Sequence, residues 1–416
     1  MSESKYLEYK ETITNTFLKT VSAFSNYGTG QIKFGIKDNG SIVGISNTTQ
    51  TCLDIENKIN DSISPQPDFS IEVNKKKKVI TLTVKEGLHK PYFYKSKAYK
   101  RNGTSTIEVD NLELTRLILI GKNLAYENLK SKKQNLTFKT LEKNLKEIVG
   151  IKTINKDILK TLELYSDDEG YNIASEILAD NNTFSGLDIV RFGKNIDIIL
   201  DREDIERVSV LTQYEKALDM FKKYYTYEEI KGSRRNLVEV VPEKAFREAV
   251  INALLHRTWD INANVRIAMF DDRVEIMSPG SLPKGLTEKE YLEGQVSVLR
   301  NPIIGNVFFR LHLIERFGTG VKRINEEYKK YSAKPKFEIY ENSIKIVLPV
   351  MLSSNHLSDD ESKVYRALEN EQVLASSDIA KITGFGKNKS IIILKKLVDK
   401  GYIKVIGSGR GTKYLI

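Results

Sequence analysis

The hydrophobic pattern of the first 125 residues predicts a helix followed by a small sheet. The run "TITNTFLKTVSAFSN" places its apolar residues at helical spacing, and "YGTG" then ends the helix. The next segment, "QIKFGI", alternates between apolar and polar positions as a strand does. Further strands are expected at "SIVGI", "FSIEV", "VITLTV" and "KAYKRNGTST". We therefore expect one α/β domain over residues 1–125.

The middle of the chain predicts a connecting region and a second α/β unit. Residues 126–239 mix amphipathic helices such as "YNIASEILAD" with strands such as "NIDIIL", and no chemistry is assigned to them. Residues 240–352 begin with the helix "PEKAFREAVINALLHR", in which Pro242 and Glu243 suit the first turn. The strands "NVRIAMF" and "RVEIMS" follow, and glycine-rich turns appear at "SPGSLPKG" and "RFGTG".

The pattern of residues 358–416 predicts a winged helix-turn-helix. The recognition helix is expected at Lys387–Lys400, and the strands "YIKVI" and "TKYLI" flank the wing tip "GSGRG". The helix is expected to turn four apolar residues toward the core: Ile391, Leu394, Leu397 and Val398. Lys387 and Lys389 would lie where base edges are contacted, and Arg410 would enter a minor groove. A winged helix that binds protein or mediates dimerisation is the alternative.

Composition narrows the functional classes. The formal net charge is +10 and the pI is near 9.1, which favours a polyanionic partner, although solubility alone could account for it. The four lysines in "NKKKK" are either a DNA contact or the tip of a hairpin. The single cysteine, Cys52, excludes an intrachain disulfide framework and a cysteine-rich zinc site. No apolar stretch predicts a membrane span or a secretory leader, so we expect a cytoplasmic protein without membrane partners.

The segments "ESKYLEYK", "VSAFSNYGTGQIKFGIKDNGSIVGI" and "KAYKRNGTST" resemble the Schlafen-type, Alba-like domain in this order. Schlafen proteins that cleave structured RNA use two glutamates and one aspartate as a metal-dependent site. The resemblance implies Glu3, Glu8 and Asp38 at those positions. Three carboxylates repel one another unless a divalent cation lies between them, so Mg²⁺ or Mn²⁺ is expected as the cofactor.

Basic residues near these carboxylates fit a phosphodiester substrate. Lys10 shares a face with Glu8 if the segment is extended, so it could contact the scissile phosphate. Lys100 and Arg101 are candidates for contacts to the phosphate backbone. Structural alternatives remain open: Glu8 could serve the dipole of the following helix, and Asp38 could be an ordinary turn residue. Nucleic-acid binding without cleavage is then expected.

The stretch from "VPEKAFREAVINALLHR" to "RFGTGVKRI" resembles the RecG C-terminal-like branch of the GHKL ATP-binding proteins. The resemblance implies that Glu248 activates water and that Asn252 holds Mg²⁺ against the phosphates of ATP; the two lie one helical turn apart. Gly318 and Gly320 match a phosphate-binding glycine box. "SPGSLPKG", with Pro279 and Gly280, stands where most GHKL proteins carry an adenine-binding aspartate.

Without that resemblance, Asn252 would be a polar residue inside a helix and His256 a surface or capping histidine.

Together these patterns predict an α/β (α+β) chain with three functional parts. We expect a nucleic-acid-binding, ATP-responsive transcriptional regulator that assembles as a homo-oligomer and binds DNA, RNA or both. The alternative is a metal-dependent endoribonuclease, for which analogy with Schlafen proteins suggests stress or phage defence. An interaction scaffold without chemistry is a third hypothesis. Helicase activity is not expected, because no Walker A pattern is present.

Overall fold

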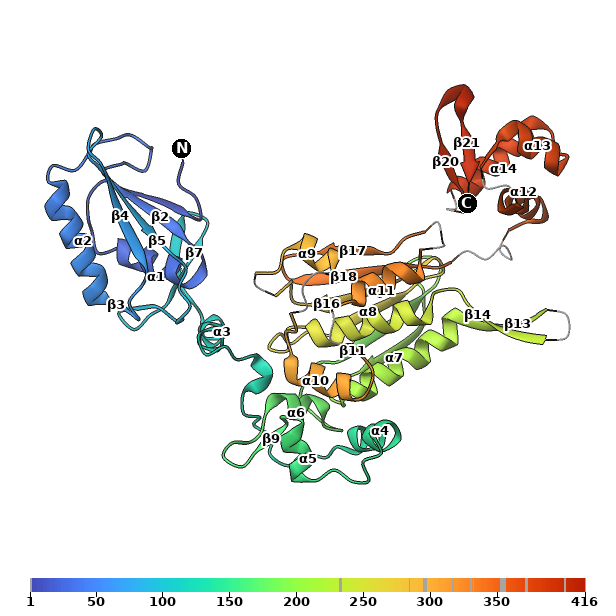
Figure 1. The fold of residues 1–416 in the computed structure, drawn as a ribbon, viewed down its shortest axis with the longest axis horizontal. Helices are drawn as coiled ribbons and strands as arrows, with labels where there is room; N and C mark the ends of the chain where they lie inside the picture. The colour runs from blue at the N-terminus through green and yellow to red at the C-terminus, as the bar shows by residue number, and fades with distance from the viewer. Residues whose placement is uncertain are drawn as a thin grey trace. The chain divides into compact units, whose positions relative to one another are not determined.

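The computed structural model describes residues 2–231, 234–283, 285–294, 298–315, 318–329, 331, 333–351, 357–370, 373–399 and 402–415. Its contacts divide the chain into two units, Met1–Tyr126 and Glu127–Ile416. Both units mix helices with sheets, which confirms the predicted α/β fold class (Figure 1). Within the described ranges, no helix has the length and apolar character needed to cross a membrane.

The first unit is built on a four-stranded mixed sheet with the order β1-β2-β5-β4. Strands β1 and β2 are parallel, whereas β2, β5 and β4 are antiparallel neighbours. Residues 75–78 connect β4 to β5 as a hairpin tip, so the four lysines occupy that tip. The strands are β1 (Leu7–Lys10), β2 (Gly30–Phe34), β4 (Phe69–Asn74) and β5 (Val79–Val84).

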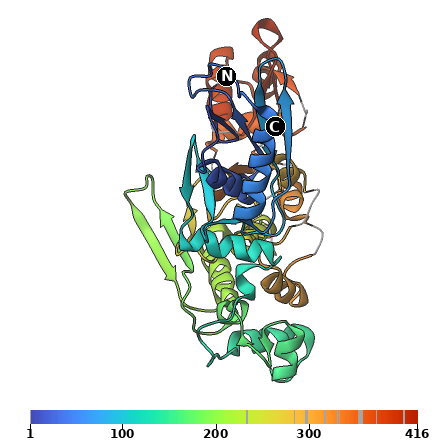
Figure 2. The ribbon, with the colours of Figure 1, turned by 90° about the vertical axis from the view of Figure 1, so that its left-hand side faces the viewer.

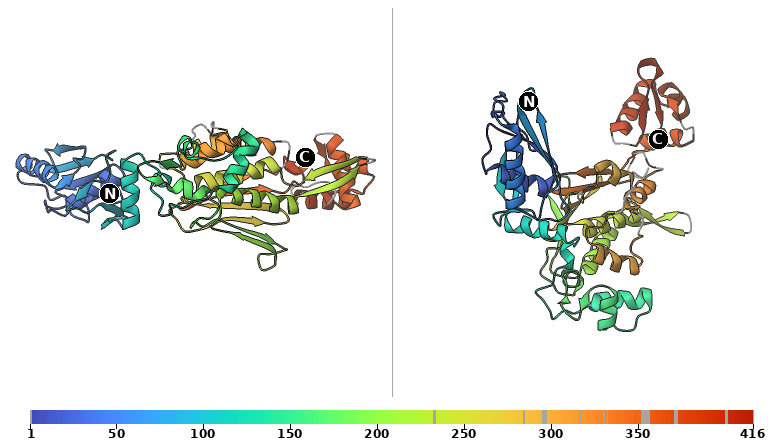
Figure 3. Two further views of the ribbon diagram at one scale, coloured as in Figure 1. Left: turned by 90° about the horizontal axis from the view of Figure 1, so that it is seen from below. Right: turned by 60° about the vertical axis from the view of Figure 1, so that its left-hand side comes forward.

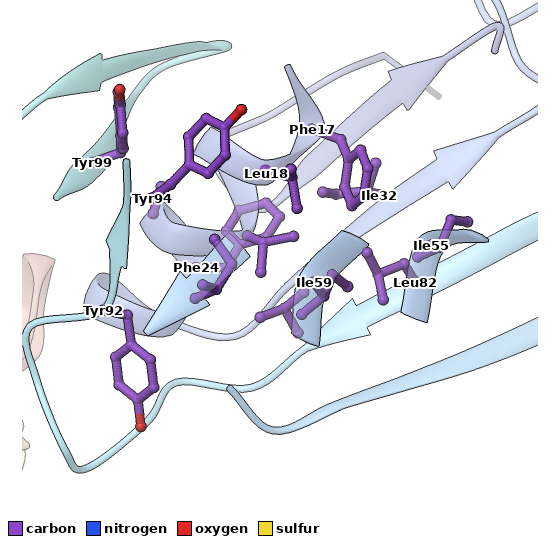
Figure 4. Packing of buried hydrophobic residues seen from close by; sticks show 14 of the residues in the cluster. Phe17, Leu18, Phe24, Ile32, Ile55, Ile59, Leu82, Tyr92, Tyr94 and Tyr99 are labelled. Carbon is purple, nitrogen blue, oxygen red and sulfur yellow. The ribbon is translucent and has the colours of Figure 1, made fainter. Parts of the chain in front are cut away.

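Helices α1 (Phe17–Tyr27) and α2 (Thr48–Ser62) enclose the core of the first unit with this sheet (Figure 4). The Phe17 and Phe34 rings meet edge to face with their centroids 5.4 Å apart. Helix α1 ends at Gly28, whose φ of 145° favours glycine. The remaining elements are β3 (Ile63–Ser64), paired with β6 (Phe93–Tyr94); β7 (Tyr99–Asn102), paired with β8 (Ser105–Glu108); and α3 (Asn111–Gly121).

The second unit contains a six-stranded sheet with the order β12-β11-β15-β16-β18-β17. Strands β11 and β15 are parallel, and the other neighbours are antiparallel. Helices α7 (Val210–Tyr225), α8 (Glu243–His256) and α11 (Gly320–Glu327) lie together over the sheet (Figure 1). The strands are β11 (Leu187–Phe192), β12 (Ile199–Ile205), β15 (Val265–Met269), β16 (Arg273–Pro279), β17 (Lys336–Ile339) and β18 (Ser343–Pro349).

Smaller elements complete the body of this unit. Helices α4 and α5 group with the short β9–β10 ladder and α6 (Figures 1 and 2). These elements are η1 (Tyr126–Asn128), α4 (Lys139–Val149), α5 (Lys156–Thr161), β9 (Tyr165–Ser166), β10 (Gly170–Tyr171), α6 (Ile173–Leu178), α9 (Glu288–Glu293) and α10 (Pro302–Arg310). Between α7 and α8, the strands β13 (Thr226–Lys231) and β14 (Arg234–Glu239) form a separate two-stranded ribbon.

The C-terminal residues form three helices and a three-stranded sheet with the order β19-β21-β20. Leu394 and Leu397 are buried as expected, but Ile391 is 41% exposed, and Ile393 is buried in its place. The buried face of α14 therefore consists of positions 390, 393, 394 and 397. The predicted face wrongly included Ile391, which is adjacent to buried Ser390. These elements are α12 (Asp359–Asn370), β19 (Leu374–Ala375), α13 (Ser376–Thr383), α14 (Lys387–Asp399), β20 (Lys404–Ile406), η3 (Gly409–Gly411) and β21 (Lys413–Leu415).

Glu127, the first residue of the second unit, caps helix α10. Its fully buried carboxylate accepts hydrogen bonds from the backbone N–H groups of Ile303 and Ile304. These donors would otherwise be unpaired at the start of the helix. Burial raises the pKa of Glu127 to about 7, although the two backbone hydrogen bonds oppose this shift.

This raised pKa predicts a pH-dependent contribution to stability. The folded chain retains a proton that the unfolded chain releases between pH 4.5, the ordinary value, and about 7. The free energy of unfolding should therefore fall as pH rises through this window. Glu127→Gln cannot ionise, so calorimetric unfolding at several pH values should show a slope flatter by about one proton. An unchanged slope would contradict this role for the carboxyl group.

Candidate nucleotide and nucleic-acid sites

Helix α8 turns Asn252 and His256 toward a small cavity in the second unit. The opposite face of the helix is buried, and Phe246 stacks on Phe221 with the ring centroids 4.4 Å apart. The end of α8 is fixed because the Asn301 amide donates to the carbonyls of Leu255 and Arg257. The Arg300 guanidinium donates to the carbonyl of His256. These bonds give the cavity a rigid wall.

The glycine-containing turn that leads into α11 also lines this cavity and packs against Asn252. Gly318 has a φ of 63°, a conformation that favours glycine. A Cβ added to Gly320 would lie 2.7 Å from Asn252 Nδ2, so only glycine allows this close approach. The Asn252 amide has no hydrogen-bond partner in the described ranges. The structure thus brings together Asn252, Gly318 and Gly320, as the sequence predicts.

The remaining lining of the cavity is mainly apolar. Its volume is about 60 Å³, which is far below that of a nucleotide-sized pocket. Burial raises the pKa of Tyr291 to about 12, so its hydroxyl stays neutral. The side chains that complete the lining are Leu282, Pro283, Leu286, Tyr291, Val298, Val321 and Ile344. The cavity as it stands is therefore too small to hold an adenine base.

His256 contributes a neutral imidazole to this cavity. Burial, with a smaller contribution from the nearby Arg300 charge, lowers its pKa to about 4. At neutral pH, the ring can therefore accept one hydrogen bond and donate one. From the sequence, His256 was expected to be a surface or capping histidine, so its position in a cavity was not predicted.

Glu248 does not face the same cavity as Asn252. Its carboxylate pairs with Arg323 of α11, with Oε1 and Nη1 3.0 Å apart. It lines a neighbouring hollow with Lys244 and Arg247. The predicted water-activating glutamate is therefore held by a guanidinium in this conformation. Arg323 lies in the sequence motif "TGVKRI". Its ion pair with Glu248 joins two helices that are distant in sequence, so no local sequence pattern could predict it.

Pro279 and Gly280 have a structural role in this conformation. Pro279 is the last residue of β16 and pairs with Ser343 of β18. Gly280 has a φ of 98°, and a Cβ there would lie 2.0 Å from Thr258 Oγ1. Neither residue lines the cavity. The structure therefore differs from the predicted cofactor contact, because both residues pack the strand end against the segment after α8.

In the first unit, Glu8 is the centre of a buried ionic network. Its Oε2 lies 3.1 Å from Arg101 Nη1, and its Oε1 lies 2.6 Å from Lys10 Nζ. Arg101 also donates to Thr106 Oγ1 and to the carbonyl of Ser4. The predicted proximity of Glu8 and Lys10 is thus present. The predicted phosphate contact by Arg101 is a correction, since its side chain is only 4% exposed and binds Glu8.

Glu3, Glu8 and Asp38 do not form a cluster of three carboxylates. The Glu3 carboxylate accepts a hydrogen bond from the backbone N–H of Tyr9 at 2.8 Å. Asp38 lies exposed in the turn after β2. Over the described ranges, no group of three or more histidine, cysteine, aspartate or glutamate side chains could hold a metal ion. The predicted metal set is not assembled in this conformation, and nuclease chemistry stays a prediction.

The other predicted nucleic-acid contacts have mixed surroundings. Lys100 pairs with Glu113, with Nζ and Oε2 2.6 Å apart. Lys389 pairs with Asp360 at 2.7 Å and lies over the Phe385 ring. Lys387 is exposed, whereas the side chain of Arg410 lies outside the described residues. The winged-helix assignment itself stays a prediction.

Two family models match the chain. Residues 3–110 match the model described as "Schlafen, AlbA_2". Residues 262–348 match the model described as "Putative ATP-dependent DNA helicase recG C-terminal". The chain therefore contains one region similar to Schlafen AlbA_2 domains and one similar to RecG C-terminal domains. Both resemblances predicted from the sequence are thereby confirmed, and they support association with nucleic acid and binding of ATP.

The two matches cover the candidate sites unequally. The Schlafen AlbA_2 domain includes Glu3, Glu8, Asp38 and Arg101. The RecG C-terminal-like domain includes the Gly318–Gly320 turn but begins after α8, so Glu248 and Asn252 lie outside the matched residues. The assignment of Glu248 and Asn252 to a nucleotide site therefore rests on where α8 packs in the structure, and not on the family match.

Solved structures provide more distant comparisons. The DIP2311 protein from Corynebacterium diphtheriae is 16% identical over 99% of this chain and 92% of its own, with a TM-score of 0.49. The N-terminal domain of a "Putative ATP-dependent DNA Helicase RecG-related Protein" from Nitrosomonas europaea is 24% identical, with a TM-score of 0.20. That comparison covers 25% of this chain and 83% of the other. None of the curated proteins matches the chain.

Proposed function

We propose that this protein is a DNA-binding transcriptional regulator whose affinity for nucleic acid changes when ATP and Mg²⁺ bind. The observation that carries the proposal is the Asn252 amide packed closely against Gly320, with Asn252, Gly318 and Gly320 lining one cavity. An asparagine with no hydrogen-bond partner among the described residues, beside a glycine turn at a helix start, fits recognition of phosphate and its bound cation.

The residues around this turn fit the triphosphate of ATP. A second hollow of about 510 Å³ adjoins the turn and is lined by Lys244, Thr319, Lys322 and Arg323, together with two glutamates. The three cations would offset phosphate charge, and backbone N–H groups at the start of α11 would donate hydrogen bonds. Asn252 would hold Mg²⁺, whose chemistry is to neutralise phosphate oxygens. The apolar cavity would receive the base in a conformation in which it is wider.

The Glu248–Arg323 ion pair favours binding over rapid hydrolysis. A glutamate that activates water needs a carboxylate oxygen directed at that water, and Oε1 of Glu248 instead accepts a hydrogen bond from Arg323 Nη1 at 3.0 Å. ATP then serves as an effector that binds one conformation of the second unit more tightly than another. The energy for a change in nucleic-acid affinity comes from the different ATP affinities of the two conformations.

Basic residues supply nucleic-acid contacts in both units. The parallel β1–β2 register places Lys10 opposite Phe34, and Lys37 follows β2 in the next turn. The β4–β5 tip with its four exposed lysines lies at this same end of the sheet, because Phe34 pairs with Ile80. In the C-terminal module, exposed Lys387 at the start of α14 is the strongest candidate for a contact to DNA.

Fluorescence anisotropy with a labelled DNA duplex tests this function. The full-length chain should bind with an affinity that falls steeply with salt. ATP with Mg²⁺ should change the dissociation constant by about fivefold or more. Lys387→Glu should weaken binding, whereas Lys143→Glu, an exposed charge reversal on α4, should not. Parallel incubations of RNA with Mn²⁺ and with EDTA separate binding from cleavage. Absence of binding at low salt would contradict the proposal.

A further inference from the structure

The β13–β14 ribbon is firmly attached at its base and unsupported further out (Figures 1 and 3). At the base, the backbone N–H of Val240 donates to the carbonyl of Tyr225, which is buried. The backbone N–H of Glu243 donates to the Glu239 carboxylate. Beyond the base, the ribbon pairs only with itself among the described residues. An isolated two-stranded ribbon is marginally stable in water.

One face of the ribbon exposes large apolar side chains. The antiparallel register pairs Glu228 with Leu237 and Ile230 with Arg235. Residues directly opposite each other, and residues two apart on a strand, share a face. These four side chains therefore lie on one face, where Ile230 is 71% exposed and Leu237 is 66% exposed. Such a pair of neighbouring apolar side chains is costly to leave in water.

The charges of the whole ribbon argue against a polyanionic partner. The two strands carry three basic residues, Lys231, Arg234 and Arg235, and three acidic ones, Glu228, Glu229 and Glu239. The ribbon is thus formally neutral within a chain of net charge +10. On the apolar face itself, Glu228 and Arg235 are both well exposed and lie 3.4 Å apart. A protein surface with mixed charges fits this face better than nucleic acid does.

A face with one carboxylate, one guanidinium and two apolar side chains is complementary to a second copy of itself. In a twofold arrangement, Glu228 of each copy can approach Arg235 of the other while Ile230 and Leu237 are covered. Further apolar area lies close to the base of the ribbon: Ile196, Ile199 and Leu200 are all more than half exposed. Asp201, which follows Leu200 in β12, forms an ion pair with Lys223 near the end of α7.

We propose that this ribbon is a self-association arm through which two copies of the chain form a dimer. The occupant of the apolar face is the same face of a second copy, with Glu228 and Arg235 exchanged across the twofold axis. The proposal does not depend on the nucleotide or nucleic-acid function. It gives a structural basis to the homo-oligomer expected from the sequence.

Sedimentation equilibrium of the full-length protein tests the arm. The wild type should dimerise, and Leu237→Glu should raise the dimer dissociation constant about tenfold or more, since it places a charge in an apolar contact. Leu88→Glu, at an 82% exposed leucine in the first unit, is the matched control and should leave the constant unchanged. Circular dichroism should show that both variants are folded.

Charge reversal gives a sharper test of the twofold geometry. Glu228→Arg alone and Arg235→Glu alone should each dissociate the dimer, because like charges then meet across the axis. A mixture of the two variants should restore dimers, since every cross-axis pair is again oppositely charged. A wild type that stays monomeric, or a mixture that stays dissociated, would overturn the proposal. So would variants that keep the mass of the dimer but lose nucleic-acid binding, which would assign the ribbon to nucleic acid.

Discussion

Arg101→Ala is expected to lower the free energy of unfolding of the first unit by about 3–5 kcal/mol, the usual cost of leaving one partner of a buried ion pair uncompensated. Glu8 is only 5% exposed, so its carboxylate cannot regain full hydration when Arg101 is removed. Lys10 would still pair with it, which places the expected loss toward the lower end of that range. The hydrogen bonds to Thr106 and Ser4 would also be lost.

Hydrogen exchange of the full-length chain can measure this loss locally. The backbone amides of β1 and β7 should exchange faster in Arg101→Ala than in the wild type. Lys97→Ala is the control, because the Lys97–Glu108 pair joins the neighbouring strand region but is half exposed at both ends. Exposed pairs contribute little to stability, so this variant should exchange as the wild type does. Equal, small effects in both variants would show that the Glu8–Arg101 pair is not structural.

Gly320→Ala is expected to weaken ATP binding by about tenfold or more without unfolding the protein. The new Cβ would lie 2.7 Å from Asn252 Nδ2 and 3.0 Å from its Oδ1. The flexible amide can rotate away at little cost to stability. It would then leave the position from which we propose that it holds Mg²⁺. Loss of one hydrogen bond or ligand interaction involving a charged group accounts for about a tenfold change.

The matched control is Gly411→Ala, since a Cβ there meets no atom within 4 Å and the residue does not have a positive φ. ATP affinity and the midpoint of thermal unfolding should be measured for both variants. Gly320→Ala should show a lower ATP affinity and an unchanged unfolding midpoint, and Gly411→Ala should change neither quantity. If Gly320→Ala binds ATP as tightly as the wild type does, Asn252 does not hold the nucleotide or its Mg²⁺.

The elements that sequence predicted well are those whose signals are local. Helix α1 is set by its apolar spacing and by the glycine that ends it. On α8, the spacing of Glu248 and Asn252 and the glycine-rich "FGTG" are each local signals, and the cavity contains Asn252 with Gly318 and Gly320; nucleotide binding there stays a prediction. The position of the lysine-rich hairpin tip likewise follows from the strands on either side.

The parts that sequence did not predict depend on partners that are distant in the chain. Arg101 was assigned to phosphate because nothing near it shows that Glu8, 93 residues earlier, would take its charge. Arg323 of α11 likewise forms an ion pair with Glu248 of α8, which is distant in sequence. Gly280 was assigned to a ligand contact because glycine often allows close approach of a ligand. In the structure, the atom that approaches Gly280 closely is Thr258 Oγ1. Ile391 was placed inward because four adjacent apolar residues leave the phase of α14 ambiguous.

Binding of ATP between α8 and the Gly318–Gly320 turn is the step on which the proposed regulation depends most directly. Isothermal titration calorimetry of ATP with Mg²⁺ into the full-length wild type and into Asn252→Ala tests this in one comparison. We predict one saturable site per chain in the wild type and a loss of measurable heat in Asn252→Ala. No binding to the wild type, or equal binding to both proteins, would contradict the account.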